Sequence, residues 1–297
     1  MKSLQIPSLG SAPEIVDNIP VQEPASDQIL VKSLWTAVNP IDSMIAAYGI
    51  LVTDWPTGLG ADAYGVVVKA GGEAKEKYGF QEGDYVVGCT RIGVREFATA
   101  QEYFLMDAAV AMRKPSNLEV PAAVTVGSAF QTAALGISKG LGISVGTTRN
   151  DVNEDRDWVL VLGGAGSVGS AAVQLLSQAG HAVVASCSPK QSSRVENLGA
   201  KGTFDYHLSL EEQIKAIEHI TGDPGDVSMI FDATSSEDPI LAKELFKTAE
   251  LQGKEKLFVT TNDWSGIGGF EGGKTYEIHL GMMGRPEARE INEGIRS

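Results

Sequence analysis

A short apolar run, followed at once by a glycine-rich turn and an amphipathic helix, most constrains how this chain can fold. The run spans residues 158–162 (WVLVL) and is continuous, as in a strand that is buried on both faces of a parallel sheet. The turn comes directly after it, and residues 167–178 then repeat apolar side chains at helical spacing. This order predicts the first strand, turn and helix of a doubly wound sheet.

The turn carries glycines at the spacing G-x-G-x-x-G. Such glycines allow a tight turn, a close approach of the backbone to a pyrophosphate, and close packing of helix on strand. The free N–H groups at the start of the following helix favour a phosphate. Glycines alone also mark ordinary loops, but a buried strand before them and a helix after them indicate a dinucleotide site. The residues expected to hold the pyrophosphate are Gly164, Ala165, Gly166, Ser167, Val168 and Gly169.

The second strand indicates which dinucleotide binds. A site for NAD usually places an acid about 20 residues beyond the glycines, on the ribose 2′-hydroxyl. Here the strand ends in residues 185–190 (ASCSPK), and the first acid after it is Glu196. Ser188 and Lys190 can donate hydrogen bonds to a 2′-phosphate, and Arg194 lies one turn further on. NADPH is therefore the predicted cofactor, and the alternative is that Lys190 is only a solvated residue at the start of a helix.

Strands and helices alternate along the second part of the chain. A helical stretch at residues 121–139 and an exposed connector at 140–157 precede the alternation. This pattern predicts an α/β fold with a doubly wound, parallel Rossmann sheet. The predicted strands are 158–162, 182–186, 203–204, 227–231, 256–260 and 275–280, and the predicted helices are 167–178, 190–198, 210–220 and 239–251.

The first part of the chain has shorter apolar runs, which Pro and Gly interrupt. Residues 28–35, 64–70 and 84–89 are predicted to be short strands with turns between them. A chain of 297 residues has the length of two domains. We therefore predict a mainly β domain over residues 1–120 and a Rossmann domain that binds NADPH over residues 121–297.

Composition and charge exclude several kinds of partner. The formal charge of −14 disfavours binding to nucleic acid or to an anionic membrane surface. The run of 18 apolar residues that a spanning helix requires is absent. Cys89 and Cys187 form no C-x-x-C pair, so a reducing, cytoplasmic setting is expected. The four histidines form no pair at metal-ligand spacing, so no metal is expected.

Several motifs resemble those of the medium-chain dehydrogenase/reductase superfamily, in particular its zinc-free enoyl reductase and quinone reductase branch. They are residues 39–42 (NPID), 60–65 (GADAYG), 80–86 (FQEGDYV), 198–200 (LGA) and 204–206 (FDY). The resemblance implies that the mainly β domain is GroES-like. Zinc alcohol dehydrogenases of this superfamily carry a Cys ligand where Asn39 stands and a His ligand where Ala61 stands. The resemblance therefore also implies a zinc-independent enzyme.

Within the superfamily, the chain is similar to the trans-acting enoyl reductases of fungal polyketide pathways. Three segments carry this likeness: residues 186–189 (SCSP), the polar connector at 140–157, and residues 127–133 (GSAFQTA). The likeness implies a carrier-bound or small-molecule enoyl substrate, a polyketide synthase as partner, and a monomer. Chains of this superfamily usually continue beyond the position of Ser297, so we also expect that the C-terminus is truncated.

The same resemblance implies where cofactor and substrate bind. The 2′-phosphate end would contact Ser188, Pro189, Lys190, Gln191 and Tyr206. The nicotinamide would lie between Thr261 and Asn262 on one side and Ile41, Asp42, Ser43 and Met44 on the other. The substrate would contact Thr132, Ala133, Leu135, Lys139, Met282 and Met283.

Other roles for some of these residues remain open, and no proton donor or other catalytic residue is assigned. Asp42 is equally suited to cap a helix, and Thr132 to bond within its own helix. Met282 and Met283 are of a type that is common in cores.

The reaction implied is hydride transfer to the β-carbon of an activated alkene, with charge gathering on the conjugated carbonyl. Two other functions are consistent with the sequence. One is an NADPH-dependent quinone or enone reductase of the same superfamily. The other is a truncated, non-catalytic protein that binds NADPH.

Overall fold

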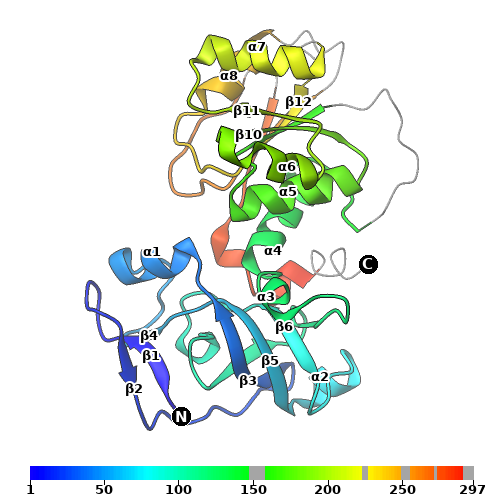
Figure 1. Cartoon of the computed structure of the whole chain (residues 1–297). Coiled ribbons are helices and arrows are strands. Elements are labelled where there is room, and N and C mark those ends of the chain that lie inside the picture. Colours follow the sequence, from blue (N-terminus) through cyan, green and yellow to red (C-terminus); the bar gives the residue numbers. More distant parts are fainter. Residues whose placement is uncertain (147–157, 223–226, 249–254, 271–272, 290–297) are drawn as a thin grey trace. The chain divides into compact units, whose positions relative to one another are not determined.

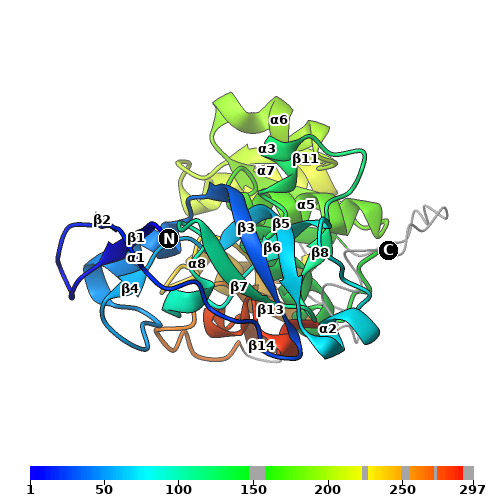
Figure 2. The same cartoon turned by 90° about the horizontal axis from the view of Figure 1, so that it is seen from below.

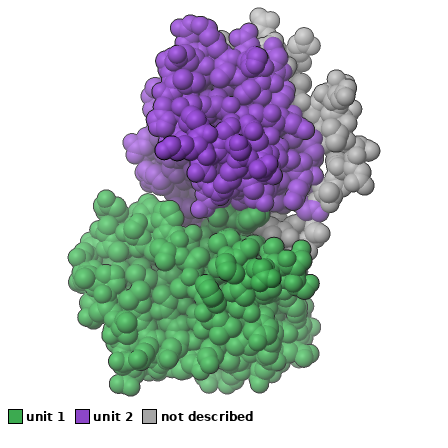
Figure 3. All heavy atoms as spheres, viewed as in Figure 1, with its two compact units in different colours: residues 1–131, 281–292 green, residues 132–280, 293–297 purple. Residues whose placement is uncertain are grey.

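The computed structural model describes residues 1–146, 158–222, 227–248, 255–270 and 273–289. The chain forms two compact units (Figures 1 and 3). Unit 1 comprises Met1–Gln131 and Gly281–Asn292, and unit 2 comprises Thr132–Leu280 and Glu293–Ser297. The connector predicted at residues 140–157 lies outside the described residues from residue 147 onward.

Unit 1 is mainly β. Its five-stranded antiparallel sheet has the order β7-β3-β5-β6-β8 (Figure 2), and a three-stranded sheet has the order β2-β1-β4. The core packs aliphatic and aromatic side chains from alternate positions of these strands, among them Ile29, Val67 and Phe104. The strands are β1 Ser3–Ile6, β2 Glu14–Val16, β3 Gln28–Ala37, β4 Thr57–Gly58, β5 Asp62–Ala70, β6 Tyr85–Cys89, β7 Tyr103–Asp107 and β8 Met112–Arg113.

Short helices connect the strands of unit 1. Helix α1 (Pro40–Tyr48) follows β3, and Pro40 at its first position has the fixed φ that suits a helix start. It ends at Gly49, which has a left-handed φ of 66°. Helix α2 (Gly72–Glu76) and a 3-10 turn at Arg95–Phe97 also belong to unit 1.

The helical stretch predicted at residues 121–139 is not one helix. It is divided into α3 (Val120–Ala123), α4 (Ser128–Leu135) and a π-helical turn at Gly136–Gly140. The division has a long-range cause, because the Asp62 carboxylate accepts a hydrogen bond from the Ser128 backbone N–H at 2.8 Å. That bond satisfies one of the free donors at the start of α4.

Unit 2 contains a six-stranded parallel sheet of order β11-β10-β9-β12-β13-β14, which confirms the predicted doubly wound α/β fold. Its core lies between the sheet and the helices α7 and α8, where Leu160, Ile217, Leu245 and Phe258 are buried. The strands are β9 Trp158–Leu162, β10 Ala182–Cys187, β11 Gly202–Asp205, β12 Val227–Asp232, β13 Lys256–Thr260 and β14 Gly273–Glu277. The helices are α5 Ser167–Gln178, α6 Ser192–Asn197, α7 Leu210–Thr221 and α8 Ile240–Thr248.

The strand order of unit 2 determines where a ligand can bind. From β9 the chain proceeds outward to β10 and β11, and it then returns to add β12, β13 and β14 on the other side of β9. In open sheets of this kind, ligands bind at the carboxyl ends of the strands, where the direction reverses. Within the described part of the chain, no helix has the length and apolarity needed to cross a membrane.

Candidate nucleotide-binding site

The glycine-rich turn leaves the carboxyl end of β9 and is anchored on the neighbouring strand. The Gly163 N–H donates to the Ser186 Oγ at 2.9 Å, and the Gly164 N–H donates to the Ser186 carbonyl at 2.9 Å. Gly163 has a positive φ of 77°, which few residues with a side chain adopt. A Cβ on Gly169 would lie 2.1 Å from the Gly163 carbonyl oxygen, so the start of α5 lies directly on the turn.

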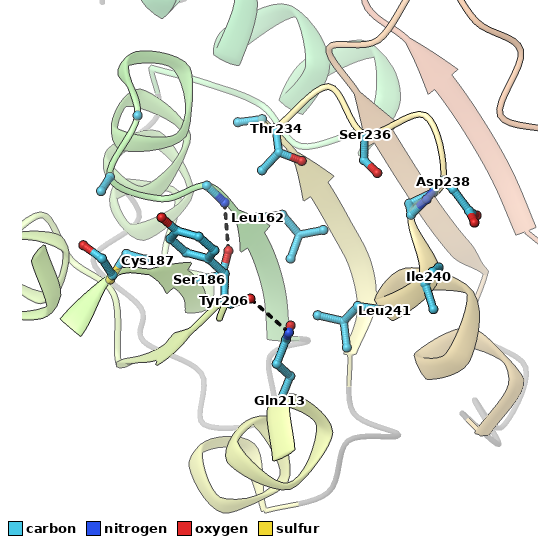
Figure 4. Close-up of a pocket in the computed structure, with 16 residues that line it drawn as sticks. Leu162, Ser186, Cys187, Tyr206, Gln213, Thr234, Ser236, Asp238, Ile240 and Leu241 are labelled. Atoms are coloured by element: carbon cyan, nitrogen blue, oxygen red, sulfur yellow. Dashed lines mark hydrogen bonds between the residues drawn. The ribbon is translucent and has the colours of Figure 1, made fainter. Parts of the chain in front are cut away.

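A pocket of about 850 Å³ opens beside this turn (Figure 4). The turn contributes Gly163, Ala165 and Gly166 to its lining, and β9 contributes Leu162. The first N–H groups of α5 have no partner within the helix, so they are free to donate to an anion there. The turn and the pocket therefore fit a pyrophosphate.

The end of the pocket beside β10 and β11 is lined by Ser188 and Tyr206, two of the residues that the sequence assigned to the 2′-phosphate end. Tyr206 is 54% exposed, and its ring lies 4.0 Å from the ring of His207, measured between centroids. The backbone of Tyr206 is held in place, because the Gln213 side chain donates to its carbonyl at 3.2 Å (Figure 4). An exposed aromatic face at this end suits a stacked base or ribose.

Cationic side chains lie on the segment that follows β10. Lys190 is exposed in the 3-10 turn Pro189–Gln191. The guanidinium of Arg194 lies 3.5 Å from the Ala165 carbonyl and 3.5 Å from the Gln191 Oε1. A positive charge therefore lies beside the glycine turn, as a ligand with several phosphates requires.

The opposite wall of the pocket was not predicted. It consists of the loop after β12 and the start of α8, from which Thr234, Ser236 and Asp238 line the cavity. In the sequence this segment is an ordinary polar loop before a helix. The signal that could have found it is its position, since it follows a central strand of the sheet at the carboxyl end.

Thr261 and Asn262, predicted beside the nicotinamide, come directly after β13 and are buried. Neither lines the pocket described above. The Asn262 side chain donates to the Ser236 carbonyl at 3.2 Å, and the hydroxyls of Thr261 and Ser235 lie 2.7 Å apart. In this structure both residues therefore hold the loop after β12.

Residues 41–44 lie in helix α1 of unit 1. Asp42 is buried, and its carboxylate accepts hydrogen bonds from the N–H groups of Asn39 and Gly60, each at 2.7 Å. It thus caps α1, the second role that the sequence left open. The side chain of Ser43 is exposed, Met44 is half-buried and Ile41 is buried.

The residues predicted to contact substrate lie in α4 and beyond. Thr132, Ala133 and Leu135 are buried, whereas Lys139 is exposed in the π-helical turn. Met283 is 1% exposed and belongs to unit 1. Met282 is half-buried.

Asp62 is a buried carboxyl group in unit 1. It belongs to the motif at residues 60–65 and contacts Asn39 of the motif at residues 39–42. Its Oδ2 accepts hydrogen bonds from the Asn39 side chain and the Ser128 hydroxyl, each at 3.0 Å. A Cβ on Gly127 would lie 2.3 Å from its Oδ1. Burial raises the pKa of Asp62 to about 6, although these hydrogen bonds oppose the shift and the charge of Asp42 adds to it.

The positions where zinc alcohol dehydrogenases carry metal ligands have other contacts here. The Asn39 amide is bonded to Asp62, and Ala61 is buried. Among the residues that the structure describes, no group of three or more His, Cys, Asp or Glu side chains is placed to hold a metal ion.

Several known proteins and one family model are similar to this chain. Residues 25–116 match the alcohol dehydrogenase GroES-like domain. The chain is 35% identical to the trans-enoyl reductase gkaC of Penicillium citrinum over 65% of this chain and 54% of that protein. It is 33% identical to the 2-methylene-furan-3-one reductase of Solanum lycopersicum over 65% of this chain and 48% of that protein.

A longer match is to a zinc-type alcohol dehydrogenase-like protein of Schizosaccharomyces pombe, with 31% identity over 81% of this chain and 68% of that protein. The chain spans little more than half the length of gkaC and of the trans-enoyl reductase xenG of Xenoacremonium sinensis, 54% and 56% respectively.

Solved structures share the fold. An alcohol dehydrogenase superfamily protein from Novosphingobium aromaticivorans has a TM-score of 0.81 and 22% identity, over all of this chain and 84% of that one. The quinone oxidoreductase of Escherichia coli complexed with NADPH has a TM-score of 0.72 and 19% identity, over 99% of this chain and 86% of that one.

Gly169→Ala should disrupt the turn. The new methyl group would lie 2.1 Å from the Gly163 carbonyl oxygen, so α5 and the turn must move apart, at a cost of about 1–3 kcal/mol in stability. Urea unfolding and titration with NADPH would measure both effects. The control is Gly266→Ala in the same unit, where a Cβ meets no atom within 4 Å. Equal stability and NADPH affinity in the two variants would contradict this interpretation of the turn.

Asp62→Asn should change how stability depends on pH. The folded-state pKa of about 6 lies above the ordinary value of 3.8, so this carboxyl contributes stability below about pH 4 that is lost as the pH rises through 6. The loss amounts to about 3 kcal/mol. Relative to Asp62→Asn, the wild-type protein should therefore become less stable between pH 4 and pH 7, as measured by urea unfolding.

The control for this measurement is Asp205→Asn. The hydrogen bonds from His207 lower the pKa of Asp205, so its contribution has the opposite sign and is lost as the pH falls. A stability difference between wild type and Asp62→Asn that is constant from pH 4 to pH 7 would show that Asp62 does not titrate in this range.

Proposed function

This chain belongs to the medium-chain dehydrogenase/reductase superfamily, and on that premise we propose that it is an NADPH-dependent enoyl reductase. The substrate would be the α,β-unsaturated thioester of a polyketide chain in secondary metabolism. The observation that carries the proposal is the similarity to several trans-enoyl reductases, with identities from 29% to 35%. The pocket beside the glycine turn supports it, because it has the lining that a dinucleotide needs.

Two parts of unit 2 would hold the cofactor. The backbone of residues 164–169 would bind the pyrophosphate, and Ser188, Lys190 and Tyr206 would bind the 2′-phosphate end, with Pro189 and Gln191 in the same turn. Arg194 joins this set, since its guanidinium lies beside the carbonyl of Ala165. When bound, NADPH supplies the hydride, so the protein's own contribution is to bind, orient and exclude water.

The remaining sites follow from the same proposal. Residues 1–120 would form the substrate domain and residues 121–297 the NADPH domain. Residues 41–44, and Thr261 and Asn262, would contact the nicotinamide. Residues on α4 and its π-helical turn, together with Met282, would contact the acyl chain. The enzyme would act without zinc, as a cytoplasmic monomer that receives its substrate from a polyketide synthase.

A second candidate function is reduction of a small, free enone or quinone. The observation that favours it is the 33% identity to a 2-methylene-furan-3-one reductase, a similarity comparable to that with the trans-enoyl reductases. Both functions use the same cofactor and the same hydride transfer. They differ in the size of the substrate and in the need for a carrier.

Turnover of two substrates separates these functions. Oxidation of NADPH, followed at 340 nm, should be faster by at least about tenfold in kcat/KM with an α,β-unsaturated acyl thioester of pantetheine than with a small quinone, because thioester and carrier arm add binding energy in the transition state. The reverse order would favour the enone or quinone reductase. Binding of NADPH without oxidation on either substrate would favour a non-catalytic protein.

Removal of positive charge near β10 tests the choice of cofactor. The double variant Lys190→Gln, Arg194→Gln should weaken NADPH binding by about 100-fold or more, because it removes two charge-assisted hydrogen bonds that contribute about 1.5–3 kcal/mol each. Its affinity for NADH should fall by a much smaller factor, since NADH lacks the 2′-phosphate. Lys201→Gln, an exposed lysine just beyond α6, is the control. If wild-type protein binds NADH as tightly as NADPH, the proposed specificity is wrong.

A further inference from the structure

Residues 233–236 form the loop after β12, which is one wall of the pocket. One buried carboxylate holds this loop. We propose that Asp232 is a positioning residue for the dinucleotide, whose carboxylate fixes residues 233–236 in the shape that binding requires. This inference rests on the proposed function, because it takes the pocket to be the cofactor site. Asp232 itself does not line the pocket, and it would act through the loop.

Asp232 is the last residue of β12 and is fully buried. Its Oδ1 accepts hydrogen bonds from the Thr234 N–H at 2.8 Å and from the Thr234 hydroxyl at 2.5 Å. Its Oδ2 accepts hydrogen bonds from the Ser236 N–H at 3.2 Å and from the Thr260 hydroxyl at 3.4 Å. One side chain thus satisfies two backbone donors of the loop and joins them to the adjacent strand β13.

The loop needs this support because its backbone is strained. Ser235 has a φ of 56°, in the left-handed region that residues other than glycine rarely adopt. Such a conformation persists only where its surroundings hold it. Here the residues on either side, Thr234 and Ser236, are tied to Asp232, and the Ser235 hydroxyl lies 2.7 Å from that of Thr261.

The loop in turn shapes the ligand site. Thr234 and Ser236 line the pocket, and their side chains border it in Figure 4. The Ala233 N–H donates to the Leu162 carbonyl at 3.0 Å, so the loop is joined to the strand that leads into the glycine turn. A Cβ added to Gly163 would lie 2.9 Å from the Thr234 Cγ2. A shift of the loop therefore displaces the wall that faces the pyrophosphate turn.

An amide cannot replace this carboxylate. In Asp232→Asn, either orientation of the side chain would point an NH2 group at a backbone N–H, that of Thr234 or that of Ser236. Two donors then face each other, and one of them remains unsatisfied in a buried position. The loop is expected to leave its strained conformation, while the sheet, which rests on backbone hydrogen bonds and its apolar core, remains.

Asp232→Asn and the milder Thr234→Val test the proposal. By fluorescence titration, Asp232→Asn should weaken NADPH binding about tenfold or more, and Thr234→Val, which removes one hydroxyl but keeps the carboxylate and the amide, by a smaller factor. Hydrogen exchange read by mass spectrometry should show faster exchange at residues 233–236 in Asp232→Asn, with unchanged exchange in β12 and β13. Thr234→Val keeps the test valid should Asp232→Asn fail to fold.

The matched control is Asp84→Asn. Asp84 also holds a turn, since its carboxylate accepts the Gln81 N–H at 3.0 Å, but it belongs to unit 1. It should leave NADPH affinity unchanged. Wild-type affinity in both Asp232→Asn and Thr234→Val, with the wild-type protein binding NADPH, would overturn the inference and leave the proposed function intact. No NADPH binding by the wild-type protein would instead overturn the proposed function, and with it this role of Asp232.

Discussion

Helix α5 can begin where it does only because Gly169 has no side chain. The Gly163 carbonyl oxygen occupies the space that a Cβ would need, at 2.1 Å, so helix and turn pack backbone to backbone. This contact orients the start of α5 along the carboxyl end of β9 and leaves the pocket beside it. The anchoring of the turn on β10, through the hydroxyl and carbonyl of Ser186, depends on the same geometry.

Buried carboxylates hold the loops of this acidic chain in both units. Asp42 joins the start of α1 to Gly60, Asp62 joins β5 to the start of α4, and Asp232 joins β12 to the loop beside the pocket. In each case these hydrogen bonds come from backbone N–H groups or neutral side chains. A carboxylate that accepts several such bonds tolerates burial. For Asp62, burial raises the pKa to about 6 in spite of these hydrogen bonds.

Helices and strands that depend only on a local sequence pattern were predicted from the sequence. Strands β9 and β13 and helix α5 begin and end at the predicted residues, because their apolar periodicity and their turns are local. The division between α3 and α4 was missed, since its cause is a carboxylate at Asp62, which is distant in sequence. The wall formed by residues 233–241 was missed for a related reason, because only the strand order brings it to the glycine turn.

The charge distribution of the chain bears on the proposed cofactor. A net charge of −14 repels a polyphosphate at long range, so the site needs local donors to overcome it. Lys190 and Arg194 supply positive charge on the segment after β10, where an NAD site would instead place an acid. The first acid in that segment is Glu196. Its carboxylate accepts hydrogen bonds from the hydroxyls of Ser192 and Thr203, so it already has partners within the protein. Under the proposed function, a 2′-phosphate would meet the cations of this segment, whereas a bare ribose would lack the carboxylate that usually binds it.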